Sequence, residues 1–88
     1  MVLVTLLFFA SARDCVGVAE RRDLLLPESA WSSAADLLDH LCSQEFPALL
    51  PLRSSLALAI NETYCTASDP ILLKDSDRLA IIPPITGG

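Results

Sequence analysis

The N-terminal segment of the sequence is apolar at almost every position. Valine, leucine and phenylalanine fill residues 2–9, interrupted only by the polar Thr5. Strands that lie in the middle of a sheet carry such continuous apolar runs, so we predict a buried strand over residues 2–10. Ser11 and Gly17 then predict a short helical turn, because serine caps a helix start and glycine tolerates the left-handed conformation that ends a helix.

A second apolar run and a helical stripe follow. Residues 22–26 predict a strand that Pro27 stops, and the compact link to the first strand favours an antiparallel hairpin. Residues 27–33 predict a loop. Over residues 32–44 apolar side chains recur at the spacing of an amphipathic helix: Ala34, Leu37, Leu38, Leu41 and Cys42. We expect Ser33 to cap this helix and Trp31 to anchor the edge of the core. We expect His40 to be a solvated surface residue.

The rest of the chain predicts further strands separated by turns. A short irregular or 3₁₀ connection is expected between Pro47 and Pro51, a third strand over residues 56–60 and a last strand over residues 78–82, which Pro83 halts. A helix between the first hairpin and a later strand favours a crossover that leaves the first and last strands parallel and central. The pattern therefore predicts an α+β fold of the ubiquitin-like β-grasp type, a mixed sheet with one main helix packed on it. We expect a domain over residues 1–82 and an extended tail over residues 83–88.

The composition excludes several classes of protein. The chain has 88 residues, of which 52% are hydrophobic and 19% charged, so it is too apolar to be disordered and long enough for one small domain. Its formal net charge is −5, and Arg21-Arg22 is the only basic pair. Binding to nucleic acid requires a basic stripe, and we therefore expect no nucleic-acid partner.

Residues 1–12 can also be interpreted as a secretory signal. They end in Ala10-Ser11-Ala12, which resembles a signal-peptidase site, and the chain contains the sequon Asn61-Glu62-Thr63. Against secretion, no lysine or arginine precedes the apolar run, and an odd number of cysteines leaves one unpaired in an oxidising compartment. The run is also too short to span a bilayer. We expect a core strand in a cytoplasmic protein without membrane contact, and an intact N-terminus on the mature chain would exclude secretion.

The cysteines and the single histidine predict no metal site and no nucleophilic pair. Cys15, Cys42 and Cys65 lack the C-x-x-C spacing of metal ligands. His40 and Cys42 are two residues apart on the predicted helix, so their side chains point to different faces. Three reduced thiols are expected, with Cys42 in the core and the other two partly buried.

The last six residues read Pro-Pro-Ile-Thr-Gly-Gly. Two prolines cannot continue a strand ladder, so the chain is expected to leave the sheet in an extended conformation. Gly87 and Gly88 add no side chain, and the Gly88 carboxylate is then the only functional group of the tail. Such an arm could enter a narrow channel and present its carbonyl group to a partner. We favour this interpretation over a mobile terminus without function, because the end is apolar and carries no charged side chain.

Three segments together resemble the molybdopterin synthase small subunit family. They are residues 8–17 (FFASARDCVG), 59–64 (AINETY) and 77–88 (DRLAIIPPITGG). The resemblance extends over essentially the whole chain, and its most specific part is the closing PPITGG after an apolar strand. Two departures are Ser76, where family members commonly have glycine, and residues 18–33, which match in pattern only.

This resemblance implies a sulfur carrier for molybdenum-cofactor synthesis. A ubiquitin-activating-type adenylyltransferase and sulfurtransferase would use ATP to adenylate the Gly88 carboxylate and convert it to a thiocarboxylate. The molybdopterin synthase large subunit would then transfer the sulfur to cyclic pyranopterin monophosphate. The chain would be a non-catalytic, sulfur-donating subunit of a heterotetramer, without a permanently bound cofactor.

The resemblance also implies which residues contact the partners. On the folded domain these are Phe9, Arg13, Tyr64 and Ile82, and in the tail Pro83, Pro84, Ile85 and Thr86, with Gly87 keeping the end slim. Two alternatives remain. A ubiquitin-like modifier would be conjugated through Gly88, and Lys74 is the single lysine on which such chains could grow. Sulfur carriers for thiamine synthesis or tRNA thiolation share the diglycine end.

Overall fold

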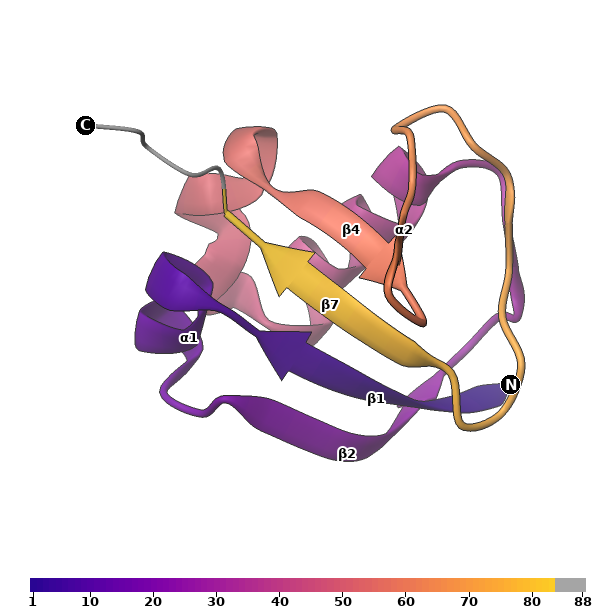
Figure 1. The fold of residues 1–88 in the computed structure, drawn as a ribbon, viewed down its shortest axis with the longest axis horizontal. Helices are drawn as coiled ribbons and strands as arrows, with labels where there is room; N and C mark the ends of the chain where they lie inside the picture. Colours follow the sequence, from indigo (N-terminus) through magenta and orange to yellow (C-terminus); the bar gives the residue numbers. More distant parts are fainter. Residues whose placement is uncertain (84–88) are drawn as a thin grey trace.

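The main element of the fold is a mixed sheet of five strands. This computed structural model describes residues 1–83 of the chain. In spatial order the strands are β2 (Glu20–Leu26), β1 (Val2–Phe8), β7 (Arg78–Ile82), β4 (Ala57–Ile60) and β5 (Thr63–Tyr64). Figure 1 shows β2, β1, β7 and β4 side by side. β1 is antiparallel to β2 and parallel to β7, and β4 is antiparallel to both β7 and β5.

Helical segments connect these strands and cover one face of the sheet. They are α1 (Ala10–Val16), α2 (Ala34–His40), a π-helix over Leu41–Glu45 and a 3₁₀ helix over Pro47–Ser55. α2 lies behind the strands in the view of Figure 1. A small second sheet pairs β3 (Ala30–Trp31) with β6 (Ile71–Leu72).

The core lies between the covered face of the sheet and the helices. Every second side chain of β1 is buried: Val2, Val4, Leu6 and Phe8. The predicted helical stripe is buried against them, with Leu37, Leu41 and Cys42 fully inaccessible. The Phe8 ring meets the Phe46 ring edge-on, with centroids 5.0 Å apart, an arrangement that aromatic quadrupoles favour. The other face of β1 is not covered, because Leu3 is exposed and Thr5 and Leu7 are only partly buried.

The predicted α+β fold, a ubiquitin-like β-grasp, is confirmed. The hairpin of the first two strands, the parallel pairing of the first and last strands and the main helix all occur as expected. The capping prediction at Ser33 is also confirmed, because its hydroxyl accepts a hydrogen bond from the Asp36 N–H at 3.1 Å. Gly17 ends α1 with φ 92°, in the left-handed region that glycine adopts readily.

Several local predictions are wrong. Ser11 does not cap α1; Phe9 takes the N-cap position with an extended backbone and no side-chain hydrogen bond. Cys15 is exposed rather than partly buried. Residues 27–33 are not all loop, because β3 pairs with β6 about forty residues later in the chain.

His40 is not a solvated residue. The chain changes from α to π geometry at Leu41. Glu45 follows His40 by five residues, and its Oε2 atom lies 3.0 Å from His40 Nε2. The ring centroids of His40 and Trp31 are 5.1 Å apart. Trp31 is the predicted anchor at the core edge: it packs half-buried against the core, and its Nε1 donates to the Glu28 carbonyl oxygen. The tilted contact with Trp31 and the pairing with Glu45 therefore hold the imidazole against the protein.

The secretory interpretation of residues 1–12 disagrees with the structure. β1 lies between β2 and β7 and contributes four buried side chains to the core. Cleavage after Ala12 would remove this strand, so residues 1–12 belong to the fold. Within residues 1–83, no helix has both the length and the apolar character needed to cross a membrane.

Candidate functional site

The open face of the sheet carries a shallow apolar depression of about 500 Å³. We define the apolar depression by six residues that line it. Five belong to β1, β4, β5 and β7, and Phe9 directly follows β1: Leu7, Phe9, Ala59, Tyr64, Ala80 and Ile82. Phe9 is 47% exposed and Tyr64 67% exposed, unusually high for large apolar side chains. Exposed apolar patches on small proteins mark contact surfaces.

Small side chains between large ones produce the depression. Ala59 of β4 lies opposite both Ala80 of β7 and Tyr64 of β5 in the strand register. Ala80 in turn lies opposite Leu7 of β1. Two neighbouring alanines therefore form a low floor, and the larger Phe9 and Tyr64 rise beside it. Successive side chains of a strand point to opposite faces of the sheet, which puts these alanines on the face away from the core.

A buried carboxylate fixes one border of the depression. Asp77 is 7% exposed and accepts hydrogen bonds at 2.9 Å from Asn61 Nδ2 and from the Lys74 N–H. Asn61 Oδ1 accepts from the Arg78 N–H, also at 2.9 Å. Asn61 begins the β4–β5 turn with φ 49° and Glu62 follows with φ 71°, the left-handed conformations of a tight hairpin turn. This network ties the turn that carries Tyr64 to the start of β7.

The structure places three of the four predicted contact residues of the domain together. Phe9, Tyr64 and Ile82 all line the apolar depression. Arg13 is exposed on α1 and does not line it. Pro83 is buried directly after β7. The predicted tail residues lie outside the described residues: Pro84, Ile85, Thr86, Gly87 and Gly88.

The last strand delivers the chain to the edge of this depression. β1 and β7 are parallel, so their C-terminal ends lie at the same edge of the sheet. The Phe9 N–H donates to the Ile81 carbonyl oxygen at 3.3 Å, which holds Phe9 beside the end of β7. The end of β7 therefore lies next to Phe9, and a partner that binds the apolar depression also meets the end of this strand.

Sequence reasoning assigned no site role to several residues, among them Leu7, Asp77 and Arg78. Leu7 was expected to be a strand residue only and Arg78 the first residue of a strand. Arg78 lines the depression together with Asn61 and Glu62. Period-two alternation assigns Leu7 and Arg78 to the open face once the sheet order is known, whereas the burial of Asp77 depends on a contact with Asn61, sixteen residues away.

Potential metal ligands and two of the thiols complete the description of the domain. Among residues 1–83 no group of three or more potential metal ligands comes together. Cys42 is fully buried, and burial raises the pKa of its thiol, an effect that Arg53 opposes and Asp39 reinforces. Burial also raises the pKa of the Cys65 thiol, reinforced by Asp69. Neither thiol is activated as a nucleophile.

Comparison with known proteins shows the family. Residues 6–88 match the ThiS family. The chain belongs to the ThiS family. Along its whole length this ThiS-family chain is 41% identical to a protein of Aedes aegypti named molybdopterin synthase sulfur carrier subunit, covering 91% of that protein. It is 43% identical, again over its full length and 93% of the relative, to the protein of the same name in Drosophila melanogaster.

A solved structure shows that the fold recurs at much lower sequence identity. The crystal structure of small archaeal modifier protein 1 from Haloferax volcanii matches with a TM-score of 0.72 and 19% identity, over 97% of this chain and 100% of the archaeal chain. At that identity the likeness supports the β-grasp fold alone.

Proposed function

We propose that this ThiS-family chain is the sulfur carrier subunit of molybdopterin synthase and that its Gly88 carries the sulfur. The full-length identity of 41% to the Aedes aegypti sulfur carrier subunit is the observation on which the proposal rests. The exposed apolar depression at the end of β7 supports it, because a carrier needs a recognition surface next to the start of its reactive tail.

The proposed chemistry takes place at the Gly88 carboxylate. This group is ionised at neutral pH and is a poor acyl donor. An adenylyltransferase would join it to the α-phosphate of ATP and release pyrophosphate, so that AMP becomes the leaving group. A sulfur donor would then displace AMP from the carbonyl carbon and leave a thiocarboxylate. Splitting the transfer into an activation step and a displacement step lowers each barrier.

The folded domain would serve both partners through its open face. We infer that the large subunit and the adenylyltransferase each cover the apolar depression, with Phe9, Tyr64 and Ile82 as contacts. Arg13 on α1 would pair with a carboxylate outside this depression, because a guanidinium can bind a carboxylate through two hydrogen bonds. General acids, bases and substrate contacts would belong to the partners.

The remaining parts of the proposal are the compartment and the assembly. The three thiols are free within the described structure, and a reducing cytoplasm would keep them so. ATP would be consumed by the adenylyltransferase and not retained by this chain. Two copies would flank a pair of large subunits in a heterotetramer.

Reconstitution tests the proposed function. The chain is incubated with ATP, a sulfur donor, the adenylyltransferase, the large subunit and cyclic pyranopterin monophosphate, and molybdopterin formation is measured. We expect product with the full chain and none with a variant that lacks Gly88, while both unfold at nearly the same temperature. Absence of product with the full chain, in the presence of active partner enzymes, would contradict the proposal.

The modifier alternative makes a different prediction in the same system. A modifier would form an isopeptide bond between Gly88 and a lysine of a target protein or Lys74 of a second copy. Peptide mass mapping of the reaction products distinguishes such a bond from a thiocarboxylate. Isopeptide products without a thiocarboxylate would favour the modifier.

A further inference from the structure

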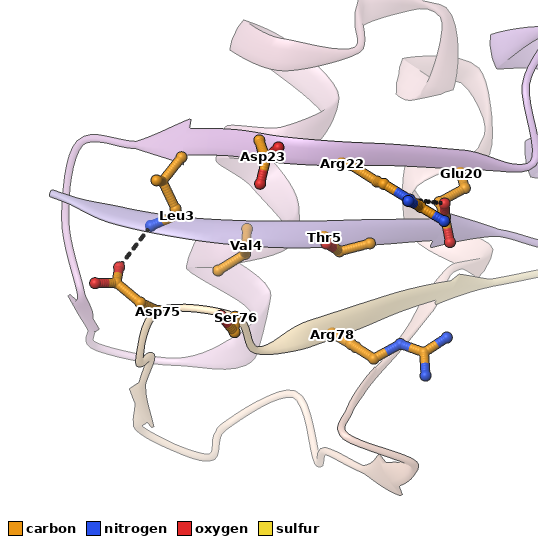
Figure 2. A pocket seen from close by; sticks show the side chains of 9 residues that line it. All are labelled: Leu3, Val4, Thr5, Glu20, Arg22, Asp23, Asp75, Ser76 and Arg78. Carbon is orange, nitrogen blue, oxygen red and sulfur yellow. Dashed lines mark hydrogen bonds and ion pairs between the residues drawn. The ribbon is translucent and has the colours of Figure 1, made fainter.

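Arg78 occupies the middle of the open sheet face. It borders the apolar depression on one side and, on the other, a second groove lined mainly by polar residues. Figure 2 shows this polar groove, with Glu20 and Arg22 on β2 and Asp75 in the loop before β7. Arg78 is the strand partner of Thr5, so both side chains belong to the face away from the core.

Several charged side chains near Arg78 already have partners. Arg22 is paired with Glu20, and Asp75 accepts a hydrogen bond from the Leu3 N–H at 2.9 Å, as the dashed lines in Figure 2 show. The buried Asp77 carboxylate binds Asn61 and the Lys74 N–H. Within residues 1–83, no hydrogen bond or ion pair involves the Arg78 guanidinium, although its backbone N–H binds Asn61. Glu62 lines the apolar depression as well but forms no ion pair with Arg78. Among the described residues the Arg78 guanidinium therefore presents an unpaired positive charge at the border of an apolar surface.

This charge restricts what can cover the apolar depression. A partner that buries Leu7, Ile82 and their neighbours also removes water from the adjoining guanidinium. Removing water from a charge costs free energy unless an opposite charge replaces the lost hydration. A carboxylate compensates a guanidinium best, because the two planar groups can share two parallel hydrogen bonds. A lysine or arginine at the same place in a partner would be repelled.

We propose that Arg78 selects the partner, by pairing with an aspartate or glutamate that the large subunit places beside its apolar contact with the depression. This inference rests on the proposed function, which supplies the large subunit as the occupant. It adds a charge requirement that the apolar contacts alone do not impose. The net charge of −5 makes the requirement selective, since this chain as a whole repels acidic surfaces and Arg78 accepts a carboxylate beside the apolar depression.

Binding measurements with charge variants test the proposal. Isothermal titration calorimetry gives the dissociation constant of the full chain, and of R78Q, R78E and R78K, with the large subunit of the same organism. We expect R78Q to bind about tenfold more weakly and R78E about a hundredfold more weakly, with R78K between wild type and R78Q. The affinity of wild type should fall with added salt, and R78Q should lose most of this salt dependence.

Arg21 provides the matched control. R21Q makes the same change in net charge, but Arg21 is the strand partner of the core-facing Leu6 and lines neither groove. We expect R21Q to bind within about twofold of wild type, because screened charges outside an interface contribute little. Thermal unfolding of each variant checks that it folds. If R78E does not fold, the affinities of R78K and R78Q test the role of Arg78.

The outcomes separate the two claims. Equal affinities of R78E and wild type, or equal losses in R78Q and R21Q, would overturn the role of Arg78 while wild-type binding still supports the proposed function. If the wild-type chain does not bind the large subunit, the proposed function fails and the role of Arg78 fails with it.

Discussion

Ser76 is held in a backbone conformation that suits glycine. Its φ is 75°, in the left-handed region, within the turn that leads into β7. The Ser76 N–H donates to the Leu3 carbonyl oxygen at 2.8 Å, and Asp75 accepts from the Leu3 N–H, so β1 fixes the turn. Within residues 1–83 the exposed Ser76 hydroxyl makes no hydrogen bond. The substitution Ser76→Gly should therefore relieve strain and remove no contact.

The expected gain follows from two opposing effects. A residue with a Cβ atom costs about 1–2 kcal/mol in the left-handed helical region. Glycine, in turn, increases the conformational entropy of the unfolded chain and costs about 0.4–1 kcal/mol. The difference predicts a net stabilisation of about 0.5–1 kcal/mol, which for a domain of this size raises the melting temperature by about 3–6 °C.

Thermal unfolding followed by circular dichroism measures this gain. Ser76→Ala is the first control and should leave the melting temperature nearly unchanged, because alanine keeps the Cβ atom. Ser54→Gly is the second control: Ser54 is exposed in the 3₁₀ helix with negative φ, and glycine there should cost about 0.5–1 kcal/mol. A lower melting temperature for Ser76→Gly than for wild type would refute the reasoning.

Three further predictions concern the core, the thiols and the buried network. Leu41→Ala should lower the free energy of unfolding by about 2–5 kcal/mol in urea titrations, because Leu41 is fully buried; a loss below 1 kcal/mol would contradict its place in the core. At neutral pH a thiol reagent should label the exposed Cys15 first and Cys42 only upon unfolding, because burial shields the Cys42 thiol and raises its pKa. Peptide mass mapping detects the labelled residue, and rapid labelling of Cys42 in the native chain would be inconsistent with the fold. Asn61→Ala removes a donor from the buried Asp77 carboxylate and should cost about 1–3 kcal/mol in the same urea titration, whereas an unchanged midpoint would show that the network is not needed.

The main elements were predictable because local apolar patterns determine them. The apolar run over residues 2–9 can be buried as a strand, and the stripe that includes Leu37 and Leu41 as a helix. The sequence pattern therefore predicted β1, α2 and their packing. The resemblance to known sulfur carriers also identified Ser76 as a position where glycine is common, and its positive φ gives the physical reason.

The features that escaped prediction depend on contacts between distant residues. Ala30 and Trp31 form a strand only because Ile71 and Leu72 lie beside them. The pairing of His40 with Glu45 depends on π geometry, which no spacing pattern signals. The apolar depression escaped for the same reason, since its floor combines alanines from β4 and β7 that become neighbours only when the sheet forms.

The central claim is that Gly88 carries sulfur, and mass spectrometry of the intact chain tests it most directly. The chain is co-expressed with the adenylyltransferase and sulfur donor, purified and measured whole, and its C-terminal peptide is then sequenced by fragmentation. The account predicts a mass gain equal to the replacement of one oxygen atom by sulfur, located at Gly88. An unchanged mass, or a sulfur located on Cys15 or another side chain instead of Gly88, would contradict it.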